Sequence, residues 1–162
     1  MFGSGTARAM GLGARLAIVS IAVAACGGGA SPSPSAAAST AAGGATVNVD
    51  LQEWAVVPSA ASAATGDVTF KATNKGPDDP HELVVAQTDL APDALPTKPD
   101  GAVDEAGAGV TVIGEIEEFA VGGSEEATFT LAAGKYVLFC NVVDAEGDAH
   151  YSKGMRTAFT VS

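Results

Sequence analysis

The chain has few of the side chains on which most protein chemistry depends. Its 162 residues include only two cysteines, two histidines and one tryptophan, and 8 lysines and arginines stand against 19 aspartates and glutamates. Two cysteines can form at most one disulfide, so a disulfide-dense scaffold is excluded. The net charge of -11 disfavours nucleic acid and anionic membrane surfaces as partners, and it either favours a partner with a basic docking surface or only keeps the protein soluble.

Long apolar runs are also scarce. Residues 16–25 (LAIVSIAVAA) are about half of the roughly 20 residues that a transmembrane helix needs. They follow Arg8 and Arg15 with no acidic residue, which is typical of a signal peptide. Residues 23–26 (Val-Ala-Ala-Cys) resemble a bacterial lipobox, so Cys26 is predicted to be lipidated. The protein would then be extracytoplasmic and lipid-anchored to a bacterial membrane, at the cell surface or in the periplasm.

The chain divides by composition into three parts. A signal peptide is predicted over residues 1–25 and a lipidated Cys26 with a flexible tether over residues 26–45, which have no charge, no aromatic side chain and no apolar periodicity. Residues 46–162 have the size of one domain. Lipidation would leave Cys140 without a partner. The alternative, a disulfide between the two cysteines, would link the tether to a strand end and stabilise no obvious structure.

Alternating apolar and polar residues predict an all-β domain. Val47, Val49 and Leu51 alternate with polar residues, which is the period of a half-buried strand. Residues 136–140 (YVLFC) are continuously apolar, so this strand is predicted to be buried on both faces. Short strands separated by turn residues, without an amphipathic helix, favour an antiparallel β-sandwich. Further strands are predicted at residues 68–73, 81–86, 119–121, 127–131 and 157–161, and a long connection with one helical turn near residues 102–106 is predicted over residues 89–114.

Four residues of this domain can form a metal site: His81, Cys140, His150 and Met155. Type 1 copper is bound by two imidazole nitrogens and a thiolate in one plane, with a weak thioether contact on the axis. His81 begins one predicted strand, Cys140 ends another, and the other two residues lie on the loop beyond it. Neighbouring strands can therefore bring the four residues to one end of a sandwich. Each residue alone is better explained as core or surface; the combination predicts one type 1 copper ion.

Other chemistries fit these residues less well. Structural zinc prefers four Cys or His ligands and a thioether is a poor ligand for it, although Asp144, Glu146 or Asp148 could supply an oxygen. Two histidines are too few for a multicopper oxidase, and one Cys in the domain is too few for a binuclear purple copper site. A Cys–His hydrolase would need a partner acid and an oxyanion motif, and neither is found near the histidines. The protein is predicted not to be an enzyme.

The domain resembles the cupredoxins, the small blue copper proteins related to plastocyanin, azurin and sulfocyanin. The matching stretches are Glu53-Trp54 with Pro58, residues 66–85 (GDVTFKATNKGPDDPHELVV), residues 134–141 (GKYVLFCN), residues 150–155 (HYSKGM) and residues 159–161 (FTV). The resemblance implies a Greek-key sandwich of seven to eight strands with copper near one end. It assigns the roles of copper ligands to His81, Cys140, His150 and Met155.

The chain departs from the family pattern in two places. Many cupredoxins follow the first His ligand with an Asn that ties the ligand loops together, whereas this chain has Glu82, which leaves open what supports the ligands. The nine residues 141–149 form a longer loop than relatives have, and they are predicted to be a solvated bulge. In relatives the edge of the second His ligand is the usual route for electrons, which indicates His150 with Ala149 and Tyr151 here.

These observations predict a type 1 copper protein that acts as a one-electron carrier outside the cytoplasm. Its partners would be redox proteins such as a cytochrome or an oxidase, and the protein would be a monomer held to the membrane by its N-terminal lipid. Two alternatives remain open. One is a copper-binding carrier or buffer without an electron-transfer role, and the other is a metal-free β-sandwich that serves as an interaction module.

Overall fold

The first strand of the domain buries every second side chain. In the computed structural model, which describes residues 44–162, strand β1 (Ala45–Gln52) buries Val47, Val49 and Leu51. The positions between these three are polar and exposed. Since successive side chains of a strand point to opposite faces, this pattern places one face of β1 in the core and the other in solvent.

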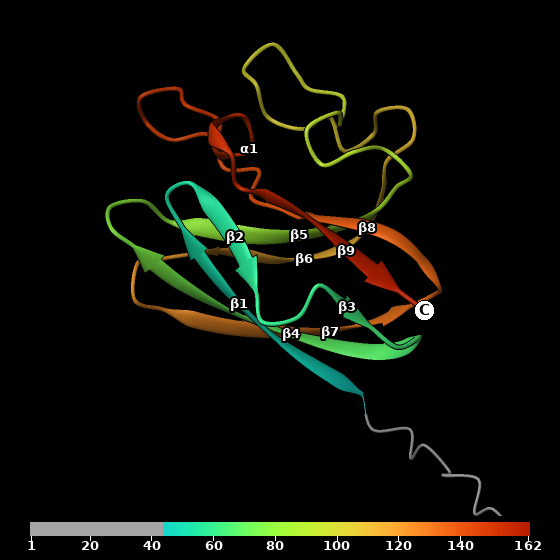
Figure 1. The fold of residues 1–162 in the computed structure, drawn as a ribbon. Helices are drawn as coiled ribbons and strands as arrows, with labels where there is room; N and C mark the ends of the chain where they lie inside the picture. The colour runs from blue at the N-terminus through green and yellow to red at the C-terminus, as the bar shows by residue number, and fades with distance from the viewer. Residues whose placement is uncertain (1–43) are drawn as a thin grey trace, which may run out of the picture. The chain divides into compact units, whose positions relative to one another are not determined.

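Nine strands in the described part of the chain form two sheets, which pack face to face (Figure 1). Besides β1 they are β2 (Ala55–Pro58), β3 (Ser62–Ala63), β4 (Gly66–Gly76), β5 (His81–Gln87), β6 (Thr111–Phe119), β7 (Ser124–Leu131), β8 (Gly134–Phe139) and β9 (Arg156–Val161). One sheet has the order β2-β1-β4-β7 and the other the order β3-β9-β8-β5-β6. Within the same residues there is one short helix, α1 (His150–Lys153).

The predicted all-β sandwich is confirmed, but two of its strand pairs are parallel. β1 pairs with β4 in parallel, and β3 pairs with β9 in parallel, whereas the other pairs are antiparallel as predicted. The alternation of apolar and polar residues reports which face is buried and not which way a neighbouring strand runs. The strands number nine rather than seven or eight because β2 and β3 are too short to show a pattern of their own.

Strand β6 is the main element that the sequence did not predict. It begins inside the predicted long connection over residues 89–114 and ends where a short strand is predicted at residues 119–121. β6 is an edge strand that pairs only with β5 and fully buries only Ile116, so it lacks the period of a half-buried strand. Residues 102–106 form no helical turn: Val103 makes an isolated β-bridge with Thr97, and a turn follows at residues 105 and 106. The short helix begins instead at His150.

Strand β8 is buried on both faces, as its continuous apolar sequence predicts. Tyr136 and Leu138 pack in the core between the sheets, whereas Val137 and Phe139 belong to a second apolar cluster on the outer face of the sheet. Tyr151 of α1 joins this second cluster and donates its hydroxyl to a carbonyl of the connection between β5 and β6 at 2.7 Å. This connection therefore holds α1 against the sheet.

One end of the sandwich collects the segments that carry the predicted ligands. The strand pairings place the ends of β1, β4, β6 and β8 beside the beginnings of β5 and β7. In Figure 1 the turns at this end lie on the left of the view, and α1 lies above them. The connections at this end can therefore bring side chains from distant parts of the sequence to one place.

The predictions for the N-terminal region lie outside the described residues. They are the signal peptide over residues 1–25, lipidation at Cys26 and most of the tether over residues 26–45. Between residues 44 and 162, no helix has the length and apolar character that crossing a membrane requires.

Candidate metal centre

Three potential metal ligands come from three different elements at this end of the sandwich. His81 is the first residue of β5, Cys140 follows the last residue of β8, and His150 is the first residue of α1. β5 and β8 are paired neighbours, with Val84 opposite Phe139. The start of one strand therefore lies beside the end of the other, which brings His81 and Cys140 together.

The donor atoms of these residues face one another at short range. The Nδ1 atoms of His81 and His150 are 3.1 Å apart, and Sγ of Cys140 lies 3.4 Å from Nδ1 of His150 and 4.0 Å from Nδ1 of His81. Atoms with these separations all lie about 2.1 Å from one point between them, and protein zinc bonds are about 2.0–2.1 Å to imidazole nitrogen and about 2.3 Å to thiolate sulfur. The triangle therefore has the size that one transition metal ion requires.

Burial keeps all three donors uncharged. His81, Cys140 and His150 are 0% exposed. Desolvation raises the pKa of the Cys140 thiol to about 12, although the backbone N–H groups of Glu82 and Val142 oppose this shift. Desolvation lowers the pKa of both histidines because it disfavours the imidazolium form. Neutral imidazoles can bind a metal directly, whereas the thiol must first lose its proton.

Met155 is bonded through its backbone to Cys140 and His150 and is also 0% exposed. Its carbonyl accepts a hydrogen bond from the N–H of Cys140 at 3.0 Å, and its own N–H donates to the carbonyl of His150 at 3.1 Å. These two bonds hold the backbone of Met155 against both residues. Two imidazoles, one thiolate and one thioether are the ligands of type 1 copper. The donor set is therefore consistent with one such ion.

Solved structures with this strand arrangement include two auracyanins. Dithionite-reduced auracyanin from the photosynthetic bacterium Roseiflexus castenholzii is 28% identical to this chain with a TM-score of 0.54, and the match covers 74% of this chain and 99% of that one. The chain has the cupredoxin fold. Auracyanin A from Chloroflexus aurantiacus, described as a blue copper protein, is 19% identical with a TM-score of 0.50, covering 74% of this chain and 100% of that one. No family model and no curated protein sequence matches the chain.

Glu82 ties together the two ligand-bearing segments of this cupredoxin domain. Its side chain accepts a hydrogen bond from the N–H of Asn141 at 2.9 Å, and its own N–H points at Sγ of Cys140 at 3.5 Å. Desolvation raises the pKa of Glu82 to about 7, although the bond from Asn141 opposes this shift. The sequence left open what replaces the Asn that many cupredoxins have at this position. In the structure Glu82 itself connects the segment of His81 to the segment of Cys140.

The long loop before His150 folds back on itself. The side chain of Asp144 accepts hydrogen bonds from the N–H groups of Glu146 and Asp148 at 3.0 and 2.8 Å. The N–H of His150 then donates to the carbonyl of Val142 at 2.9 Å, which returns the chain to the end of β8. The loop is a closed turn with an exposed tip, in agreement with the predicted bulge, and it leaves His150 beside the other donors.

A second group of potential ligands shares His150. Ligand atoms of Asp79, Asp144 and His150 lie within 4.8 Å of one another. Asp144 is one of the loop carboxylates that could supply an oxygen ligand to zinc. It is not a member of the group that His150 forms with His81 and Cys140, in which the donors are nitrogen and sulfur. The inner group therefore lacks the oxygen donor on which the zinc alternative depends.

Glu53 is a buried carboxylate beside His81 to which the sequence assigned no role. Its Oε1 atom lies 3.5 Å from Nε2 of His81 and accepts hydrogen bonds from the N–H groups of Asp79 at 2.8 Å and Asp78 at 3.2 Å. Desolvation acts to raise the pKa of Glu53, but these backbone bonds outweigh it and the pKa is lowered. An ionised carboxylate at Nε2 favours the tautomer that leaves Nδ1 free for a metal. In the sequence, Glu53 is marked only by its place in a stretch that resembles cupredoxins.

The edge of His150 does not reach the surface of this cupredoxin domain. His150, Ala149 and Tyr151 are 0%, 4% and 3% exposed. No partner can touch these side chains directly, so an electron that leaves by way of His150 must cross another residue. Trp54, in contrast, is 36% exposed, and the centroid of its indole lies 5.1 Å from that of the His150 ring.

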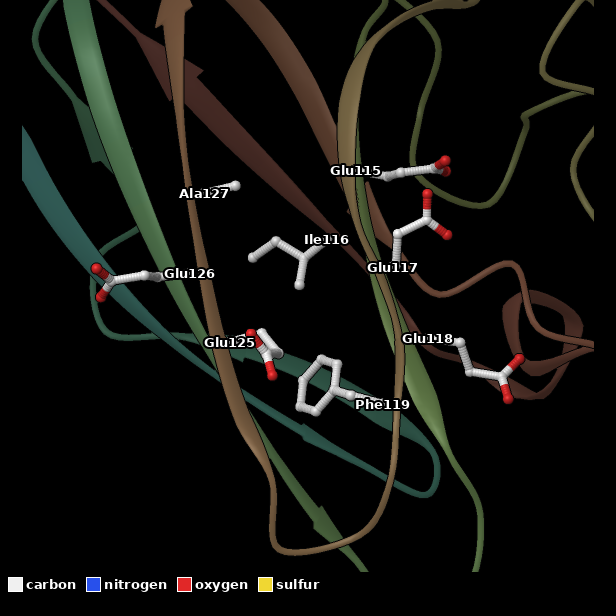
Figure 2. Close-up of a pocket in the computed structure, with 8 residues that line it drawn as sticks. All are labelled: Glu115, Ile116, Glu117, Glu118, Phe119, Glu125, Glu126 and Ala127. Carbon is white, nitrogen blue, oxygen red and sulfur yellow. The ribbon is translucent and has the colours of Figure 1, made fainter.

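A surface groove between β6 and β7 is separate from these donors. Figure 2 shows Ile116 and Phe119 between the two edge strands and glutamates along them. None of the residues that line the groove belongs to the triangle of donors or to the group around His150. The glutamates are exposed, and Glu126 forms an ion pair with Lys71 at 2.9 Å. The groove is therefore not part of the candidate metal centre.

Proposed function

We propose that this protein carries one electron at a time between larger redox proteins, with a type 1 copper ion held by His81, Cys140, His150 and Met155. The triangle of buried donor atoms around a point about 2.1 Å from each is the observation that carries the proposal. Bound copper would supply the redox chemistry, because it can change between Cu(I) and Cu(II).

The chain itself supplies a dry and fixed set of ligands. His81 and Cys140 are held by paired strands, and His150 is held by a helix that packs against the same sheet. Because all three are fully buried, water is excluded from the donor atoms. Soft sulfur suits Cu(I) and imidazole suits Cu(II), so a fixed set of both types limits rearrangement when an electron arrives or leaves.

The proposed location is outside the cytoplasm, on a lipid anchor at Cys26. Support comes from the signal-peptide pattern before Cys26 and from the tether that follows it. Cys140 is a free, buried thiol, and bound metal would protect it from oxidation in that compartment. The acidic charge of the chain favours redox partners with a basic docking surface, and we propose that the protein acts as a monomer.

Titration of the purified protein with Cu(II) tests the proposed function. One equivalent of copper should produce the intense visible band of thiolate-to-copper charge transfer, and Cys140→Ser should abolish it. Asp144→Asn is the matched control and should retain the band, because Asp144 is outside the triangle of donors. Met155→Leu should keep the band and raise the reduction potential, since the weak axial ligand is lost. A colourless titration of the wild-type protein would contradict the proposal.

A second measurement separates electron transfer from copper delivery. Full burial of the donors favours retention of the ion, because no ligand is exposed to an incoming acceptor. The copper-loaded protein should therefore exchange electrons with a cytochrome faster than it loses copper to a chelator of Cu(I). The opposite order would support the copper carrier or buffer, and failure to bind copper would support the metal-free interaction module.

A further inference from the structure

We propose that electrons enter and leave this protein through Trp54, and that its partner docks over this indole. The inference rests on the proposed function and adds to it the contact surface and the kind of partner. It starts from the burial of the four predicted ligands, each of which is 0% exposed. Since no partner can touch a ligand directly, another side chain must connect the ligands to the surface.

Trp54 meets that requirement because it touches a ligand and solvent at once. Its ring centroid lies 5.1 Å from that of His150 at an interplanar angle of 69°, which is an edge-to-face contact. The ring of His150 in turn lies 5.0 Å from that of His81. The exposed part of Trp54 is 36% of its surface. One aromatic side chain therefore spans the distance from the buried imidazoles to the surface.

The position of Trp54 is fixed on both sides. On one side it follows Glu53, whose carboxylate accepts backbone hydrogen bonds from the connection between β4 and β5. On the other side lies the end of α1, where the Lys153 ammonium group is 5.8 Å from the indole centroid. A Cβ atom at Gly154 would lie 3.0 Å from the Trp54 carbonyl oxygen. The indole is therefore held between the β1–β2 turn and α1.

The surroundings of Trp54 indicate the chemistry of the partner. Val121 and Val143 are 43% and 38% exposed, on the β6–β7 connection and on the loop after Cys140, which lie at the same end of the sandwich as Trp54. We call these three exposed apolar side chains at one end of the sandwich the Trp54 patch. Carboxylates lie at the same end: Asp78 and Asp79 donate their N–H groups to Glu53, Asp144 lies near His150, and Asp148 pairs with Lys153 beside the indole. The nearby cation Lys153 is paired with Asp148 at 2.7 Å.

An apolar patch with an acidic rim fits a one-electron redox protein whose cofactor edge lies within a ring of lysines. With copper bound, one electron would pass from the reduced partner, which would be oxidised by one unit, to the metal, which would change from Cu(II) to Cu(I). No bond forms or breaks, no proton moves, and the indole of Trp54 ends the step unchanged. The reverse transfer follows the same route to an oxidised partner.

The first test needs no copper and uses mitochondrial ferrocytochrome c, a basic haem protein, as the probe. The chain has one tryptophan, so the metal-free ¹⁵N-labelled protein gives a single indole N–H resonance. This resonance should shift on titration with the probe at low ionic strength. The shift should shrink near 0.15 M salt, where the Debye length is about 8 Å. The amide resonance of Leu90, which is 37% exposed beyond the opposite end of β5, should not move.

The second test measures electron exchange between the copper-loaded protein and the same cytochrome by stopped flow. Trp54→Ala should lower the second-order rate about tenfold or more, which corresponds to ~1.4 kcal/mol of activation free energy. Trp54→Phe should lower it less because a ring remains. Leu90→Ala is the matched control, with nearly the same exposure, and should leave the rate unchanged.

The outcomes separate this inference from the proposed function. Absence of the visible copper band in the wild-type protein would refute the proposed function before any partner is added. An intact band in Trp54→Ala with an unchanged rate, or an indole resonance that does not respond to the cytochrome, would overturn the role of Trp54 alone. If Trp54→Ala fails to fold, the Trp54→Phe rate and the indole resonance of the wild-type protein decide the question.

Discussion

The carboxylate of Glu53 should control both the stability of the metal-free protein and its affinity for metal. Glu53→Gln keeps the shape of the side chain and an oxygen that can accept the two backbone hydrogen bonds, but it removes the negative charge. The pKa of Glu53 is lowered overall, because the backbone hydrogen bonds outweigh desolvation, so the folded protein favours the charged form. Neutralising this group should therefore destabilise the fold.

The size of the effect follows from the two hydrogen bonds. A bond to a charged group contributes about 1.5–3 kcal/mol and a bond between neutral groups about 0.5–1.5 kcal/mol. The bond from Asp79 is partly buried and the one from Asp78 is exposed, so the first should dominate. We expect the free energy of unfolding of the metal-free protein to fall by about 1–2 kcal/mol. Loss of a carboxylate that orients a ligating His should lower metal affinity about 10–100-fold.

Urea denaturation of the metal-free protein gives the first quantity, and a competition titration against a chelator gives the second. Asp50→Asn is the control, because it removes one charge from the preceding strand β1 at an exposed ion pair with Lys75. It should change stability by less than about 1 kcal/mol and leave metal affinity unaltered. NMR of the His81 ring nitrogens should place the proton on Nε2 in the wild-type protein. Unchanged affinity in Glu53→Gln, with the same His81 tautomer, would refute the reasoning.

Three other predictions concern the thiol, the buried side chain of Asn74 and the backbone at Gly154. The pKa of Cys140 is raised to about 12 and the pKa values of both histidines are lowered, so metal loading at pH 7 should release about one proton per ion. An indicator dye measures this release. If no proton is released, the thiol is excluded as a ligand. Asn74→Ala removes three hydrogen bonds of a fully buried side chain, so the free energy of unfolding measured in urea should fall by about 2–4 kcal/mol. The control Thr73→Ala removes one exposed hydrogen bond and should lower the same free energy by less than about 1 kcal/mol. Equal losses in the two variants would contradict this account. Gly154→Ala forces a non-glycine residue to a φ of +129° and places its Cβ atom against the Trp54 carbonyl, so the free energy of unfolding should fall by about 1–3 kcal/mol. An unchanged unfolding midpoint would show that the backbone relaxes at no cost.

The β-sandwich could be predicted from the sequence because the burial of a strand determines its pattern of apolar and polar residues. Apolar and polar residues alternate along strand β1 because one of its faces is exposed to solvent. Strand β8 is continuously apolar because a second apolar cluster covers its outer face. Strand β6 has no such pattern, since it is an edge strand that fully buries only Ile116 and therefore lacks a continuous apolar face. Strand direction leaves none either, because parallel and antiparallel neighbours bury the same side chains.

The candidate ligands could be named because the chain has so few residues of the right kinds. With two histidines in total, His81 and His150 had no competitors. Their neighbours could not be found in the same way. Glu53 is one of 19 acidic residues, and only the fold shows that its carboxylate faces His81. The burial of His150 also depends on packing, because Trp54, whose ring contacts the imidazole, comes from the distant β1–β2 turn.

The strands and α1 hold the three donor side chains at bonding range of a common centre. Donors at these separations discriminate only weakly between ions of similar size. Any thiophilic ion of similar radius would fit, and the usual order of affinities places copper ahead of zinc and nickel. Correct loading of this protein is then decided by which metal the compartment offers first, so its metal content should follow the supply during growth.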